Sequence, residues 1–185
     1  MSRTIGWLVV LAIYSTGCGV AGRARFRSAT GPGEPLMPPL TSFADLAATR
    51  ARLGHPLEWQ VVSNKLRKGA WASPSYSDVW VEVAGHELLG HRGVLRLHFD
   101  NLRLEDTRFY PEDQPAVVAA VETKMHVRFV RQEGWKHSVV ELSNNVHVVE
   151  GEDGWGRYVS WLDHRLLRES DDWWTIFASG QQSWR

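Results

Sequence analysis

Several residue classes are scarce in this chain of 185 residues. The single cysteine, Cys18, excludes an internal disulfide framework. Lys plus Arg number 21 and Asp plus Glu number 21, so the basic excess of a nucleic-acid binder is absent and no nucleic-acid partner is expected. No apolar run reaches about 18 residues, which disfavours a helix that spans a membrane. Because 43% of the residues are hydrophobic, we expect one globular domain and not a disordered chain.

The first residues have the pattern of an export signal. Arg3 precedes an apolar run from Ile5 to Tyr14, a length that suits the h-region of a signal and is too short to cross a bilayer. Ser15-Thr16-Gly17-Cys18 follows directly and resembles the lipobox of bacterial lipoproteins. In that family the cysteine receives a lipid and becomes the mature N-terminus. Ser15 departs from the family pattern, which usually has an aliphatic residue there.

This resemblance covers the signal alone and implies nothing about the fold. It implies that Cys18 carries a lipid and that the membrane is a partner of the protein. Gly19 is not the aspartate that directs inner-membrane retention in such lipoproteins, so the implied location is the bacterial cell envelope, at the outer membrane and facing the periplasm or the surface. The alternatives are a secreted protein cut after Ala21 and an uncleaved N-terminal anchor.

The chain divides into three parts on this interpretation. Residues 1–17 are the export signal. Residues 18–40 contain four of the eight prolines and are predicted to form a semi-rigid tether after the lipid site, because proline disfavours both helices and central strands. Residues 41–185 are predicted to form a single β-rich domain.

Within that domain the hydrophobic period changes along the chain. Residues 42–53 predict an amphipathic helix, with Ser42 as its cap and Gly54 as its stop. Later segments alternate apolar and polar residues, as in antiparallel strands with one buried face. These segments are 57–61, 79–83, 95–99, 117–129, 137–149, 158–167 and 173–184.

The alternation predicts a mainly β fold at the margin of α+β. We expect an antiparallel sandwich or barrel, built as a meander, with one N-terminal amphipathic helix. A cone-shaped α+β fold of the nuclear-transport-factor type is the alternative. Residues 115–120 are compatible with a short helix as well as with a strand.

The segment His86-Glu87-Leu88-Leu89-Gly90-His91 resembles the metal-binding helix of zinc proteases. That helix needs histidines four residues apart, whereas the second histidine here comes five residues after the first. The segment is therefore predicted to connect strands that end at Val83 and begin at Val94. A turn there could still bring His86, Glu87 and His91 together as a metal site, and a solvated loop is the simpler interpretation.

Other signals of catalysis are absent. The sequence has no P-loop, no Rossmann glycine fingerprint and no nucleophile elbow, so no catalytic residue and no cofactor are assigned. Several of the eight histidines fall on the predicted polar faces of strands. They could form a metal cluster or a pH-sensitive surface, or they could simply be exposed side chains. Whether the protein is an enzyme stays open, with a non-catalytic role favoured.

Tryptophan is abundant, with ten residues. Trp80 falls on the polar face of its predicted strand, and Trp173 and Trp174 are expected on opposite faces of another. The candidate binding surface consists of Trp80, Trp173, Trp174 and Trp184. Exposed aromatic rings with a polar edge suit sugars and protein partners.

These observations predict a lipid-anchored, non-catalytic envelope protein whose β domain binds a protein, glycan or lipid partner. The alternatives are a metal-assisted hydrolase that uses the His/Glu cluster and a small-ligand carrier with an apolar cavity.

Overall fold

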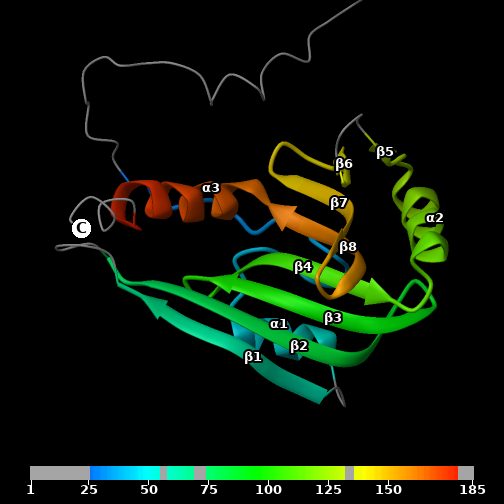
Figure 1. Cartoon of the computed structure of the whole chain (residues 1–185), viewed down its shortest axis with the longest axis horizontal. Coiled ribbons are helices and arrows are strands. Elements are labelled where there is room, and N and C mark those ends of the chain that lie inside the picture. Colours follow the sequence, from blue (N-terminus) through cyan, green and yellow to red (C-terminus); the bar gives the residue numbers. More distant parts are fainter. Residues whose placement is uncertain (1–25, 55–57, 69–73, 132–135, 179–185) are drawn as a thin grey trace, which may run out of the picture.

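The computed structural model describes residues 26–54, 58–68, 74–131 and 136–178. In this part of the chain, eight antiparallel strands form one sheet with the order β1-β2-β3-β4-β8-β7-β6-β5 (Figure 1). The strands are β1 (Glu58–Arg67), β2 (Tyr76–Leu88), β3 (His91–Asp100), β4 (Arg103–Pro111), β5 (Val130–Arg131), β6 (Ser138–Glu141), β7 (Val146–Asp153) and β8 (Gly156–Asp163). The helices are α1 (Leu46–Leu53), α2 (Gln114–Met125) and α3 (His164–Trp173), which continues into a π-helical turn, η1 (Trp174–Ala178).

The sheet consists of two four-stranded meanders, β1 to β4 and β5 to β8, joined by the pairing of β4 with β8. The prediction of a mainly β, antiparallel domain is confirmed. The sheet is not closed into a barrel, and three α-helices accompany it in the described residues, where one was predicted. None of the described helices is long and apolar enough to cross a membrane.

One face of the sheet is apolar and carries the core. Val81, Leu97, Phe109 and Val148 from four strands are fully buried there. Helix α2 adds Val117 and Val121 to this core, and α1 lies behind β1 to β3 in Figure 1.

The core also includes part of the predicted tether, which is a correction to the sequence interpretation. Leu36, Met37 and Leu40 are buried in the core cluster. The Arg165 guanidinium donates to the Pro32 carbonyl at 3.0 Å. Prolines keep this segment out of regular structure, but its three apolar side chains still gain from burial. Residues 26–40 therefore pack on the domain, and residues 18–25 lie outside the described part.

The prediction of a strand over residues 117–129 is wrong, and the helical alternative for 115–120 is correct. Asp113 caps α2 by accepting from the Ala116 amide at 3.1 Å, and Pro115 occupies its first turn. Val117 and Val121 are four residues apart, so they share a helix face as well as a strand face. The alternation therefore could not distinguish the two.

The last predicted strand, residues 173–184, is also wrong over its described part. Strand β8 ends at Asp163, which caps α3 by accepting from the Arg165 amide at 2.9 Å. Asp163 also accepts from the Ser42 hydroxyl at 2.6 Å. Ser42 is therefore not a helix cap, and α1 begins three residues later than Ser42 predicted, after Asp45.

The boundaries of the other predicted strands differ less from those in the structure. The predicted strand over 137–149 is a hairpin of β6 and β7, and the one over 158–167 ends where α3 begins. Strand β4 was not predicted at all. It carries the feature that shapes the candidate site, a β-bulge opposite β3.

Candidate functional site

The second face of the first meander is polar, yet much of it is buried. Side chains on this face come from neighbouring positions, since Trp80 pairs with His98 and His98 pairs with Asp106. Only 6% of the surface of Arg96 and 3% of that of Asp106 is accessible to solvent. A buried polar surface of this kind needs partners for every charge, so each contact is informative.

His98 lies at the centre of this polar face. Its ring stacks on Trp80 with centroids 4.2 Å apart and an angle of 11° between the planes. Its Nε2 lies 3.3 Å from Oδ1 of both Asp78 and Asp100, and its Nδ1 lies 3.5 Å from Glu105 Oε2. Carboxylates therefore flank both nitrogens of one imidazole.

The β-bulge explains how two consecutive acids reach this cluster. Phe99 pairs with Leu104 while His98 pairs with Asp106, which leaves Glu105 as the extra residue on β4. In a regular strand Glu105 and Asp106 would point to opposite faces. A bulge re-aims one side chain, and here both carboxylates are buried on the polar face.

A tight turn holds Asp100 and Glu105 near each other. Asn101 and Leu102 form the β3–β4 connection and have φ angles of 48° and 62°. Such left-handed conformations match a two-residue hairpin turn. The Ser77 amide donates to Asn101 Oδ1 at 3.1 Å, and Asn101 Nδ2 donates to Glu169 Oε1 at 3.2 Å. The turn is thus fixed on two sides.

The carboxyl groups of the cluster have pKa values that are shifted in opposite directions. Burial, with the nearby Asp100 carboxyl, raises the pKa of Glu105. Burial also raises the pKa of Asp106, against the opposing effect of Arg108. The hydrogen bond from His98, together with Arg67, holds the pKa of Asp78 below its usual range. Glu105 Oε2 and Asp106 Oδ1 are buried without a hydrogen-bond partner among the described residues.

Arginines and aromatic rings cover the rest of the polar face. The Arg108 guanidinium lies 5.0 Å from the Trp80 ring centroid and 5.3 Å from that of Tyr158. The Arg96 guanidinium lies 3.5 Å from the centroid of Trp155, at the turn between β7 and β8. That turn therefore folds over the polar face, as Figure 1 shows.

Trp155 is the most exposed of the described tryptophans, with 71% of its surface accessible. Its amide donates to Asp153 Oδ1 at 2.9 Å, and Asp153 Oδ2 accepts from the Tyr110 hydroxyl at 2.8 Å. Arg96 lies against one face of the ring. The ring is therefore held in place at an exposed position, and the sequence analysis did not select it.

The predicted tryptophan surface is only partly assembled. Trp80 lies on the polar face as predicted, but His98 and Arg108 occupy its ring. Trp173 is buried against Tyr76, and Trp174 is 41% exposed with the Arg67 guanidinium 4.3 Å from its centroid. The two were expected on opposite faces of a strand, but this segment is helical. Trp184 lies outside the described residues.

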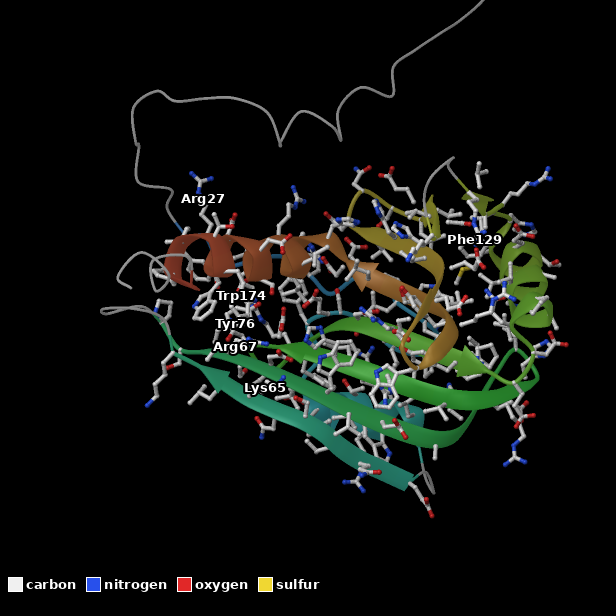
Figure 2. All side chains as sticks on the ribbon, in the orientation of Figure 1. Arg27, Lys65, Arg67, Tyr76, Phe129 and Trp174 are labelled. Carbon is white, nitrogen blue, oxygen red and sulfur yellow. The ribbon has the colours of Figure 1, made fainter. Side chains whose placement is uncertain are left out.

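Arg67 contacts both Trp174 and the His98 cluster. Figure 2 shows Arg67, Tyr76 and Trp174 between α3 and the strands β1 and β2. Arg67 also donates to Asp78 Oδ2 at 2.7 Å, and Asp78 faces His98. Trp174 is therefore connected to the His98 cluster through the ring contact of Arg67 and its ion pair with Asp78.

The three residues of the zinc-protease-like segment do not form the metal-ligand cluster. Strand β2 continues to Leu88 and turns at Leu89 and Gly90, so His86 pairs with Gly93. His86 is buried with its ring edge-on to Phe109, and burial lowers its pKa. Glu87 is exposed. His91 begins β3.

In the described residues, the group of potential metal ligands is His98, Asp100 and Glu105, whose ligand atoms all lie within 4.8 Å of one another. Sequence reasoning missed it, although His98 and Asp100 are two residues apart on one strand face. That spacing was a usable signal. The sequence gives no comparable signal for Glu105, because a β-bulge cannot be inferred from the alternation of apolar and polar residues.

Comparisons of the chain with protein-family models, curated proteins and solved structures find no match. The candidate site is therefore interpreted from its own geometry.

Proposed function

We propose that this chain is a non-catalytic cell-envelope protein, anchored through a lipid on Cys18, whose polar sheet face binds a glycan. The anchor rests on the lipobox-like residues 15–18, and the glycan rests on the geometry around Trp155. The two parts are independent, and each has its own test.

The observation that carries the glycan proposal is the Trp155 ring. It is 71% exposed, and Arg96 supports one of its faces at 3.5 Å from the centroid. A ring that is already fixed loses little conformational freedom on binding, which favours affinity. Indole combines a large apolar surface with a polar N–H edge, and this combination suits the apolar faces and hydroxyl rims of sugar rings.

The surroundings of Trp155 favour a glycan over a protein partner. The residues around the ring are polar or amphipathic: Arg96 lies beneath it, and Asp153 and Tyr110 lie beside it. A stable protein interface usually buries about 800 Å² on each partner, with an apolar core at its centre. Carboxylate, guanidinium and phenol groups around a single exposed ring match the hydroxyl groups of a sugar more closely.

The glycan is tested by calorimetric titration of the purified protein with chitotriose and maltotriose, together with co-sedimentation on isolated cell-wall sacculi. Trp155→Ala is expected to weaken binding at least about tenfold, equivalent to about 1.4 kcal/mol. Trp155→Phe should retain part of the affinity because an aromatic face remains. Val130→Ala, at an exposed position on β5, is the matched control and should bind normally. Equal binding by Trp155→Ala and the wild type would contradict the proposal.

The anchor is tested by intact mass and detergent partitioning of the wild type beside Cys18→Ala. We expect a lipid-sized mass increase and membrane partitioning in the wild type, and neither in the variant. A wild type that is as soluble as Cys18→Ala and begins near Gly22 would remove the anchor and leave a secreted protein.

A further inference from the structure

We infer that His98, Asp100 and Glu105 form a binding site for a divalent transition-metal cation such as Zn²⁺ or Mn²⁺. This site is separate from the glycan surface at Trp155, and it does not depend on the lipid anchor. It is also distinct from the His86, Glu87 and His91 segment suggested by the sequence.

The donor set and its spacing carry the inference. One imidazole and two carboxylates, with ligand atoms within 4.8 Å of one another, supply the nitrogen and oxygen donors that zinc and manganese use. His98 Nε2 lies 3.3 Å from Asp100 Oδ1, and Nδ1, on the other side of the ring, lies 3.5 Å from Glu105 Oε2. Donors bound at about 2.0–2.1 Å around a tetrahedral ion stand roughly 3.3–3.5 Å apart. One nitrogen and the carboxylate that faces it therefore already have the spacing of a ligand pair, and rotation of the second carboxylate toward the same nitrogen would complete the set.

A second observation is independent of this spacing. Glu105 is only 2% exposed, and its Oε2 has no hydrogen-bond partner among the described residues although it faces the imidazole. An isolated buried carboxylate is strongly disfavoured unless it is paired, protonated or bound to a metal. A cation between Glu105 and its neighbours supplies the missing partner.

The charges around the ring have the balance that a divalent cation requires. Four carboxylates, those of Asp78, Asp100, Glu105 and Asp106, lie in the cluster. Two guanidinium groups pair with them, Arg67 with Asp78 and Arg108 with Asp106. Asp100 and Glu105 are the two carboxylates of the cluster for which the described residues show no guanidinium ion pair.

The surrounding residues position these ligands as metal sites require. The Tyr76 hydroxyl donates to Asp100 Oδ2 at 2.8 Å, which leaves Oδ1 directed toward His98. With His98 Nδ1 and Glu105 toward the cation, Nε2 can donate to Asp78 Oδ1, 3.3 Å away. Such outer partners fix the orientation of a ligating histidine. Trp80 stacks on the ring and further restricts it.

The competing arrangement has the same cluster holding protons in place of a cation. A shared proton between Asp100 and Glu105 would neutralise the pair without any metal. The two arrangements differ in one measurable respect, because only the first gives saturable binding of one cation per chain.

The test is calorimetric titration of the chelator-treated, full-length protein with ZnCl₂ and, separately, MnCl₂. We expect one cation per chain. His98→Gln and Glu105→Gln should each weaken binding by about 100-fold or more, and Tyr76→Phe, which removes only a positioning contact, by about tenfold. Co²⁺ absorbance in the visible range gives a second readout of an ordered nitrogen and oxygen shell.

The matched control is His164→Gln. His147 and His164 form a separate histidine pair, with ring centroids 3.7 Å apart, and are the alternative ligands against which the His98 site is tested. The control is expected to leave the His98 site unchanged. Absence of stoichiometric binding to the wild type would overturn the inference. So would binding that is lost in His164→Gln and retained in His98→Gln. If Glu105→Gln fails to fold by circular dichroism, Asp100→Asn and Tyr76→Phe keep the inference falsifiable.

Discussion

The two faces of the first meander are buried by different means. On the apolar face, Leu97 and Phe109 are fully buried in contact with other hydrocarbon groups, an arrangement that lowers the free energy of folding directly. On the polar face, between the same strands, Asp100, Glu105 and Asp106 are at most 3% exposed. Burying these acids disfavours folding unless something neutralises them. The polar face thus has the composition expected for the proposed binding role, and the apolar face supplies stability that offsets the cost of burying it.

The largest expected effect tests the apolar face. Phe109→Ala removes a fully buried ring from the core cluster and should lower the free energy of unfolding by about 3–5 kcal/mol. Urea unfolding followed by fluorescence measures this loss. Leu66→Ala, at a site 63% exposed on β1, is the control and should change stability by less than about 0.5 kcal/mol. Similar losses in both variants would mean that this face is not the main source of stability.

On the polar face, a substitution is expected to increase the free energy of unfolding, by a smaller amount. In metal-free protein, Glu105→Gln should raise the free energy of unfolding by about 1–3 kcal/mol at neutral pH, because the buried charge is removed. The folded-state pKa of Glu105 is raised, so its stabilising contribution is complete below its ordinary pKa of 4.5 and is lost as pH rises. The gain from Glu105→Gln should therefore shrink as pH falls toward 4.5. A gain that is independent of pH would show that the charge of Glu105 is not its cause.

Glu105→Gln also sharpens the comparison when metal is added. The wild type should gain stability with saturating Zn²⁺ because the cation binds only the folded state, and the weaker-binding variant should gain less. The more stable apo-protein would then be the one that binds the cation more weakly.

The smallest of the expected effects concerns the His147 and His164 pair, where the second meander meets α3. Burial, with the neighbouring His147, lowers the pKa of His164 to about 4. The folded state therefore binds fewer protons than the unfolded state between pH 6.5 and that value, and stability is lost as pH falls through this window. His164→Gln should reduce the loss by on the order of 1–2 kcal/mol, measured by urea unfolding at several pH values. An unchanged acid profile would place the sensitive group elsewhere.

Sequence patterns predicted the face that depends on periodicity and missed the face that depends on irregularity. Val81 and Leu97 alternate with polar residues, and both were placed correctly in strands with one buried face. Val117 and Val121 fit both periods, so α2 was taken for a strand. Leu36 in the proline-rich segment gave no periodic signal, although it is buried in the core.

The candidate site was hidden for a different reason. Its assembly requires the pairing of β3 with β4, the tight turn at Asn101 and Leu102, and the bulge at Glu105. These are tertiary features, and a hydrophobic pattern does not encode them. Trp155 was overlooked because it lies in a turn, and its significance comes from Arg96 on a distant strand. Trp80 was chosen for its alternation, but the neighbouring side chains cover its ring.

The most direct measurement is anomalous X-ray diffraction from crystals of the protein soaked in MnCl₂ or ZnCl₂. The account predicts one strong anomalous peak on the polar face, with His98, Asp100 and Glu105 as ligands at about 2.0–2.2 Å. A map without a peak there, with Asp100 and Glu105 carboxyl oxygens within hydrogen-bond distance of each other, would contradict it.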